Sequence, residues 1–155
     1  MNEIVFLPLR ADLLAGAAVV EQACLETAWS EKQLSELPEY AVYLTALAGP
    51  RVVGIGCLYA VSDDAELMNL AVLPSFRGKG IGGELLAKLC KEAAKRGCTG
   101  VVLEVASRNE TAKKLYEKQG FVPVGVRKGF YRGDDAILMK KELLPDGERV
   151  TEEGN

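Results

Sequence analysis

The stretch of the chain best suited to chemistry is a glycine-rich turn with two cations, directly before a strongly periodic helical segment. Its residues are Arg77, Gly78, Lys79, Gly80, Ile81, Gly82 and Gly83. Glycine reaches positive φ at little cost, and the first N–H groups of a helix lack intrahelical partners and lie at the positive end of the helix dipole. The turn therefore predicts a cradle for an anion such as a pyrophosphate.

The glycine spacing is also compatible with a dinucleotide-binding turn. Gly78, Gly80 and Gly83 match the pattern G-x-G-x-x-G. Residues 74–77, however, separate the apolar strand that ends near Leu73 from the first glycine, whereas a strand runs almost straight into that glycine in a dinucleotide fold. Only about three strand-like segments follow, too few to complete a doubly wound sheet. A third interpretation is a loop that merely turns the chain, with its two cations in solvent.

The elements that must position this turn predict a mixed α/β fold. Ile81, Leu85 and Leu89 mark one apolar helical face, and Gly97 stands where a left-handed C-cap would. Strands are expected at 4–7, 40–48, 52–60, 66–73, 100–105, 121–126 and 136–143, and further helices at 13–25, 31–37 and 109–119. Ser30 is the expected N-cap of the helix at 31–37, and Asp63-Asp64 the expected turn before the strand at 66–73. The fold class is α/β (α+β), with a mixed central sheet of about six to seven strands flanked by about four helices.

The composition is that of one globular domain. The 155 residues are 48% hydrophobic and 26% charged, and we expect a single domain over residues 1–144. Residues 145–155 are polar and acidic without periodicity, and we expect a disordered tail there. The net charge of −3 disfavours a nucleic-acid surface. Since the N-terminus lacks a signal-peptide pattern and no long apolar segment occurs, we expect a cytoplasmic protein without membrane contact.

Histidine is absent, which removes the commonest general base and the commonest zinc ligand. Proton transfer must then use a carboxylate, tyrosine, lysine, cysteine or water. The four cysteines are scattered without C-x-x-C spacing, so we expect buried reduced thiols and neither a disulfide nor a metal site. Without a histidine partner for any thiol, a covalent acyl-enzyme is disfavoured.

The turn and several further segments resemble the GNAT acetyltransferase superfamily. Residues 77–82 match its acyl-CoA signature R/Q-x-x-G-x-G/A. Within the superfamily, the chain from about residue 21 to 140 resembles the RimI-type ribosomal-protein alanine N-acetyltransferases. The matching segments are Trp29–Lys32, Asn69–Val72, Leu103–Val105, Asn109, Leu115–Glu117, Gly120–Phe121, Tyr131 and Asp135–Ile137. The resemblance implies the GNAT fold and one N-acetyltransferase domain.

The resemblance also implies roles for the matching positions, with acetyl-CoA as cosubstrate. Backbone groups of Leu70, Ala71 and Val72, in the strand expected at 66–73, would hold the pantetheine and the acetyl carbonyl. Asn109 would contact the pantetheine arm, and the glycine turn would hold the pyrophosphate. Glu104 would be the general base and Tyr116 the acid. Trp29 and Tyr131, as aromatic residues with a polar edge, are candidates for the border of the acceptor groove.

Each of these residues also has a purely structural interpretation. Glu104 could end a strand in solvent, Tyr116 could anchor the core, Asn109 could be a helix N-cap, and the two aromatic residues could be ordinary packing residues. An N-terminal amine nevertheless suits a carboxylate base. Its pKa is about 7.7 to 8.0 against about 10.4 for lysine, so its deprotonation at neutral pH costs roughly 3 kcal/mol less.

The chain departs from the RimI-type pattern, which usually has arginine two residues after the catalytic glutamate. Here that position is Ala106, arginine stands at Arg108, and the loop 132–134 is short. The cofactor assignment is therefore firmer than the peptide specificity. The expected partner is a protein N-terminus, with a small-subunit ribosomal protein as the candidate. The alternatives are acetylation of a lysine side chain or a small amine, and a CoA-binding module without catalysis.

Overall fold

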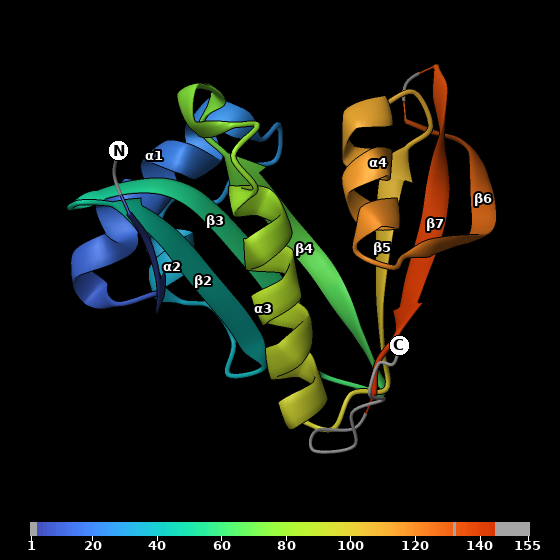
Figure 1. The fold of residues 1–155 in the computed structure, drawn as a ribbon, viewed down its shortest axis with the longest axis horizontal. Helices are drawn as coiled ribbons and strands as arrows, with labels where there is room; N and C mark the ends of the chain where they lie inside the picture. The colour runs from blue at the N-terminus through green and yellow to red at the C-terminus, as the bar shows by residue number, and fades with distance from the viewer. Residues whose placement is uncertain (1–2, 132, 145–155) are drawn as a thin grey trace. The chain divides into compact units, whose positions relative to one another are not determined.

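The computed structural model describes residues 3–131 and 133–144, and its chain divides into two compact units (Figure 1). The first unit comprises the residues up to Tyr59 together with Met68–Leu89, and the second comprises Ala60–Leu67 together with the residues from Cys90 on. The elements are β1 (Ile4–Pro8), α1 (Leu14–Cys24), α2 (Glu31–Ser35), β2 (Ala41–Ala48), β3 (Arg51–Tyr59), β4 (Asp64–Val72), α3 (Ile81–Lys95), β5 (Gly100–Ala106), α4 (Glu110–Lys118), β6 (Val122–Tyr131) and β7 (Asp134–Glu142). Short 3₁₀ helices at Ala11–Leu13 and Pro74–Phe76 precede α1 and follow β4. The tail expected at 145–155 lies outside the described residues.

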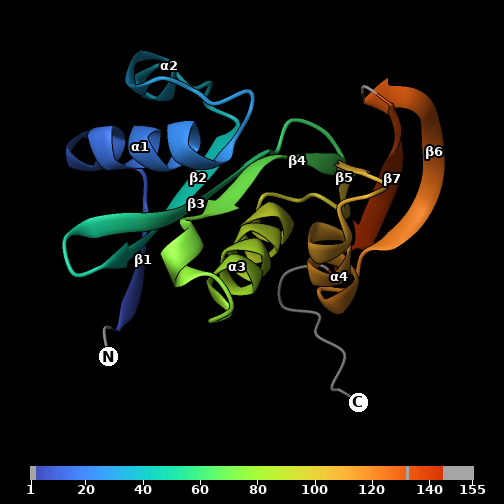
Figure 2. The same ribbon diagram turned by 90° about the horizontal axis from the view of Figure 1, so that it is seen from above.

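In the first unit, β1, β2 and β3 form successive antiparallel pairs. Helices α1 and α2 lie on one face of these strands and α3 lies on the other (Figure 2). Strands covered on both faces are apolar almost throughout, rather than alternating. This explains why β2 and β3 are buried along nearly their whole length.

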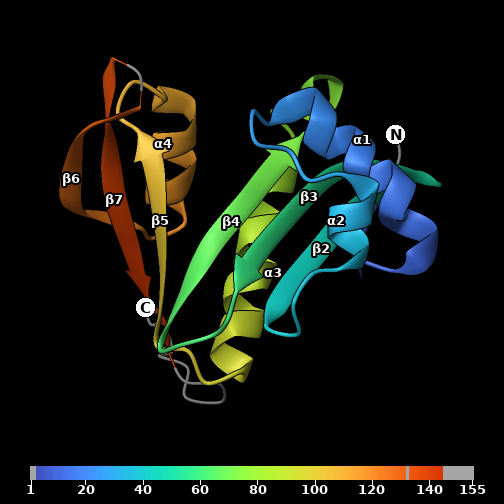
Figure 3. The same ribbon diagram turned by 180° about the vertical axis from the view of Figure 1, so that it is seen from behind.

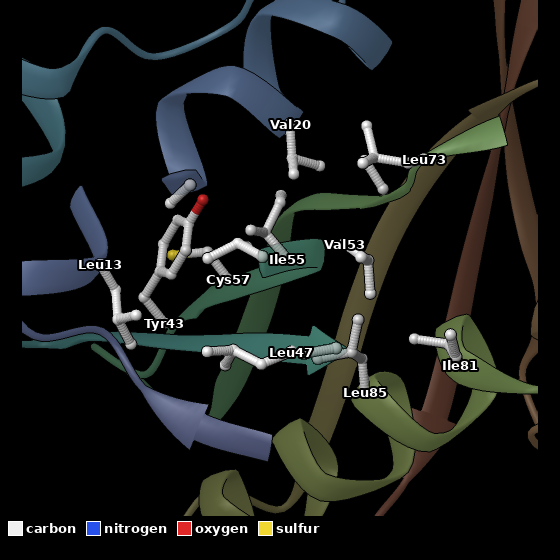
Figure 4. Packing of buried hydrophobic residues seen from close by; sticks show 14 of the residues in the cluster. Leu13, Val20, Tyr43, Leu47, Val53, Ile55, Cys57, Leu73, Ile81 and Leu85 are labelled. Atoms are coloured by element: carbon white, nitrogen blue, oxygen red, sulfur yellow. The ribbon is translucent and has the colours of Figure 1, made fainter. Parts of the chain in front are cut away.

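The core of the first unit is built from both helical layers. Val20 of α1 faces Ile55 of β3, while Leu85 of α3 lies on the other side of the strands (Figure 4). Val20, Ile55 and Leu85 are each 0% exposed, and full burial of such a side chain contributes about 1.5–3 kcal/mol. The predicted N-cap Ser30 is confirmed, because its side chain accepts from the backbone of Gln33 in a capping box that starts α2.

In the second unit, the start of β4 pairs in parallel with β5, which pairs antiparallel with β7, and β7 pairs antiparallel with β6. Helix α4 lies beside β5 and β7 (Figures 1 and 3). None of its residues is fully buried. The expected turn at Asp63-Asp64 also opens β4: the Asp63 carbonyl accepts from the N–H of Thr99 at 2.8 Å, and the Asp64 carboxylate lies 3.4 Å from Nζ of Lys140.

The predicted fold class is confirmed. Among the residues that the structure describes, hydrogen bonds link the strands in the order β1-β2-β3-β4-β5-β7-β6, in one mixed seven-stranded sheet with four α-helices. The antiparallel pairs exclude the all-parallel doubly wound sheet of a dinucleotide-binding fold. Strand β6 extends to Tyr131, beyond the predicted end at 126, because its pairing with β7 continues past Gly125 and through a register shift after Arg127. No helix in the described ranges is long and apolar enough to cross a membrane.

Candidate active site

The glycine turn has the backbone conformation that the sequence predicts. Gly78 has φ +76° and Gly80 has φ +85°, and an added Cβ at either position would meet no atom within 4 Å. The N–H of Glu84 donates to the carbonyl of Gly80 at 3.0 Å as α3 begins, so the preceding N–H groups of residues 81–83 come before the first intrahelical bonds. The turn is thus open and lined by orphan donors, which fits an anionic ligand.

Arg77 ties this turn to the neighbouring elements. Its Nε donates to the carbonyl of Val72 at 2.8 Å, and its guanidinium lies 3.7 Å from Sγ of Cys24 on α1. Lys79 is exposed. Of the two cations predicted beside the pyrophosphate, Arg77 therefore also fixes the turn against the end of β4.

The predicted backbone segment for the pantetheine lies at the end of β4 in the same unit. Ala71 is buried, Leu70 and Val72 are partly buried, and the next N–H, that of Leu73, donates to the carbonyl of Val53 at 2.8 Å. This bond to β3 holds the last residues of β4 as the chain enters the Pro74–Phe76 turn.

Glu104 lies on β5 in the second unit and forms an ion pair that the sequence did not reveal. Its Oε2 is 2.9 Å from the guanidinium of Arg127 on β6, and the Glu104 side chain is 26% exposed. Strand register places Ala136 of β7 opposite both Ala106 and Arg127, so small side chains flank the path by which the arginine reaches across β7. Glu104 is therefore a partly desolvated, oriented carboxylate rather than a free strand end.

Asn109 and Tyr116 lie at the start and in the last turns of α4. The Asn109 side chain accepts from the N–H of Ala112 at 3.1 Å, which confirms the N-cap interpretation. Tyr116 is partly buried, and its ring centroid is 6.0 Å from that of Phe121. The N-cap bond uses the Asn109 side-chain oxygen, so its amide nitrogen is the group suited to a ligand.

Trp29 belongs to an aromatic cluster in the first unit. Its ring stacks on Tyr59, with centroids 6.3 Å apart and planes 11° apart, and its centroid lies 6.4 Å from that of Tyr43. Tyr131 ends β6 in register with Asp134. Trp29 thus packs against other aromatic rings, as one interpretation of the sequence expected, and it lies on the segment between α1 and α2.

The candidate residues fall into two groups. The first unit holds Trp29, residues 70–72 and the glycine turn, while the second unit holds Glu104, Asn109, Tyr116 and Tyr131.

Two residues that take part in these contacts were missed from the sequence. Arg127 had no signal, because its partner is distant in the chain; Glu21 had one, since it lies four residues after Ala17 on the apolar stripe of α1.

The buried thiols of Cys57 and Cys90 are not prepared for nucleophilic catalysis. Burial raises the pKa of Cys57 to about 12, with a further contribution from the charge of Glu21, and burial also raises the pKa of Cys90. All four cysteines are free thiols. Within residues 3–131 and 133–144, no group of three His, Cys, Asp or Glu side chains could hold a metal ion.

Comparisons with known proteins agree with this arrangement. The model of the acetyltransferase (GNAT) family matches residues 12–121. The [ribosomal protein bS18]-alanine N-acetyltransferase of Salmonella typhimurium is 35% identical over 81% of this chain and 88% of its own, and that of Escherichia coli is 33% identical over the same shares. The crystal structure of the ribosomal-protein-S18-alanine N-acetyltransferase from Escherichia coli has a TM-score of 0.82 at 29% identity, covering 96% of this chain and 99% of that one. Arabidopsis thaliana NAA60 in complex with a bisubstrate analogue shares the fold, with a TM-score of 0.79 at 19% identity and coverage of 91% and 98%.

Proposed function

Since this chain belongs to the acetyltransferase (GNAT) family and is an N-acetyltransferase, we propose that it transfers the acetyl group of acetyl-CoA to the N-terminal alanine of a ribosomal protein. The observation that carries the acceptor is the similarity to bS18-alanine N-acetyltransferases, at 33–35% identity over about four fifths of the chain. Acetyl-CoA is the acetyl donor of this family. An enzyme that acts on a ribosomal protein would work in the cytoplasm.

The glycine turn fits the diphosphate of acetyl-CoA. Its open backbone, the N–H groups at the start of α3 and the charge of Lys79 would together neutralise the pyrophosphate. Backbone groups of Leu70, Ala71 and Val72 would hold the pantetheine and the acetyl carbonyl, with the side-chain amide of Asn109 on the pantetheine arm. These assignments draw support from the open turn and from the amide nitrogen that the N-cap bond leaves to Asn109.

The chemistry proceeds by direct attack of the neutral amine on the thioester. The bond from nitrogen to the acetyl carbon forms, the carbon–sulfur bond breaks, the amine proton passes to Glu104 directly or through one water, and Tyr116 donates a hydrogen bond or a proton to the departing thiolate. The ion pair to Arg127 uses Oε2 of Glu104. Oε1 is then the oxygen that would accept the proton. Trp29 and Tyr131 would border the acceptor.

A peptide panel tests this proposal. Peptides that begin with Ala, Ser, Met or Gly, and one Nα-blocked peptide with a free lysine, are incubated with acetyl-CoA, and the modified nitrogen is identified by mass spectrometry. We expect the alanine peptide to be preferred and the blocked peptide to remain unmodified. Acetylation of the blocked peptide alone would refute N-terminal specificity.

The role of Glu104 is tested by Glu104→Gln, which should lower kcat by roughly 10²–10⁴-fold. Binding of acetyl-CoA should persist and raise the unfolding temperature as in the wild type, since ligand at a hundred times its Kd adds about 2.7 kcal/mol. Glu36→Gln, the same change at an exposed position of the first unit, is the matched control. Unchanged kcat in Glu104→Gln, with binding of CoA retained, would instead favour another base.

A further inference from the structure

One fully buried carboxyl group in the first unit has no part in the proposed chemistry. Glu21 lies on α1 and is 0% exposed. Its Oε1 accepts from the backbone N–H of Trp29 at 3.0 Å, and its Oε2 accepts from the hydroxyl of Tyr43 at 2.8 Å. Nδ2 of Asn69 lies 2.8 Å and 2.9 Å from the two oxygens. No lysine or arginine pairs with Glu21 among the residues that the structure describes.

Packing alone does not account for a carboxylate at this position. Removing a carboxylate from water costs several kcal/mol unless hydrogen bonds satisfy its lone pairs, and an apolar side chain of similar volume would often be at least as stable. The hydroxyl of Tyr43 points toward α1 (Figure 4), and its pKa is raised by burial and by the charge of Glu21. The donors that reach the Glu21 carboxyl group are thus a backbone N–H, a hydroxyl and an amide, all of them neutral.

The three donors come from three different elements. Trp29 lies on the segment between α1 and α2, Tyr43 on β2 and Asn69 on β4. Trp29 is followed directly by Ser30, whose capping box starts α2. Asn69 directly precedes Leu70, the first residue of the proposed pantetheine segment. One carboxylate therefore joins the segment with the candidate acceptor residue to the strand with the candidate cofactor residues.

We infer that Glu21 is a positioning residue whose buried carboxylate fixes the backbone at Trp29 against Asn69 of β4 and thereby sets the geometry of the acceptor-binding segment. The inference rests on the proposed function, because it takes Trp29 to border the acceptor. Its basis is hydrogen-bond complementarity. Only a group that accepts at both oxygens satisfies the Trp29 N–H and the Asn69 amide at Oε1 together with the Tyr43 hydroxyl at Oε2.

Swapping the two partners tests this inference. Asn69→Asp places a second carboxylate beside Glu21, at a position now 2.8 Å from Oε1, and should break the arrangement. Glu21→Gln keeps the shape but replaces one acceptor with a donor. The double variant Glu21→Gln with Asn69→Asp restores a donor facing an acceptor and keeps one negative charge. Glu26→Gln is the matched control, since Glu26 is exposed on the same segment.

Two readouts separate positioning from general stability. The first is KM for the alanine peptide measured apart from KM for acetyl-CoA. The second is the fluorescence of Trp29, the only tryptophan of the chain. We expect Asn69→Asp to raise the peptide KM by about tenfold, as for a lost hydrogen bond to a charged group. Its Trp29 emission should shift as well, and the double variant should reverse both changes.

The inference is overturned if the double variant is no better than Asn69→Asp, or if Glu21→Gln and Asn69→Asp leave both the peptide KM and the Trp29 emission at the values of Glu26→Gln. If Asn69→Asp does not fold, Glu21→Gln alone decides between these outcomes. A wild-type protein that acetylates no N-terminus would refute the proposed function. The emission of Trp29 would still report on Glu21, so the two failures are distinguishable.

Discussion

Substituting alanine for a glycine of the turn separates the cost of the backbone conformation from the loss of a ligand. Gly78 and Gly80 have φ of +76° and +85°, and a Cβ at either would meet nothing within 4 Å. The substitution therefore introduces no clash, and its cost is the left-handed conformation, about 1–2 kcal/mol. Arg77 anchors the start of the turn, but the space around Gly78 and Gly80 lets the free protein relax to negative φ at these positions, and binding must restore the original conformation.

We therefore expect Gly78→Ala and Gly80→Ala each to weaken acetyl-CoA binding by roughly 5–30-fold, the equivalent of 1–2 kcal/mol. The matched control is Gly49→Ala. Gly49 lies in the β2–β3 turn with φ +59° and an equally open Cβ position. The Gly49→Ala variant should lose about 1–2 kcal/mol of unfolding free energy and keep the wild-type affinity for acetyl-CoA. Isothermal titration with acetyl-CoA and urea unfolding measure the two quantities.

The reasoning is refuted if both turn variants bind acetyl-CoA within about twofold of the wild type. It is equally refuted if Gly49→Ala loses as much affinity as they do, because the effect would then come from stability. A further comparison uses NAD, which should bind none of these proteins.

Three other perturbations test the second unit, the core and the buried thiol. Arg127→Gln should lower kcat about tenfold through the orientation of Glu104. It should destabilise by less than about 1 kcal/mol, because the arginine is 53% exposed, and Lys128→Gln should leave kcat unchanged. Leu85→Ala, at a fully buried position, should lower the free energy of unfolding, measured by urea titration, by about 2–5 kcal/mol. Gly54→Ala should cost less stability in the Leu85→Ala protein than in the wild type, because the added Cβ would lie 3.2 Å from the Leu85 side chain. The pKa of the Cys57 thiol is raised from 9.0 to about 12 in the folded protein. The contribution of this thiol to the free energy of unfolding is therefore complete below pH 9 and is lost as the pH rises toward 12. Cys57→Ala should therefore show a shallower alkaline loss of stability, and equal slopes would contradict this.

The sequence predicted those parts of the fold and site that depend on local patterns. The glycine turn, the helix that follows it, the Ser30 cap and the Asn109 cap each have a signature within a few residues. Long-range pairs were not accessible in this way. Arg127 on β6 reaches Glu104 on β5 across β7, and no local periodicity encodes this strand order.

Glu21 is an intermediate case. Its spacing from Ala17 on α1 is a local signal of burial that was missed, and its partners Tyr43 and Asn69 lie 22 and 48 residues away. The end of β6 was missed for a different reason. Its glycines and charges weaken the β-type pattern, and pairing with β7 outweighs that preference.

Helix α4, which has no fully buried residue and carries Tyr116, is expected to be less protected than α3. Few buried contacts oppose its local unfolding, so its amide hydrogens should exchange with solvent sooner than those of α3, where Leu85, Leu86 and Leu89 are completely buried. The proposed proton donor would then sit on a segment that opens and closes. Occupancy by acetyl-CoA, through Asn109 at the helix start, would slow that exchange and couple donor binding to the order of the group that completes the reaction.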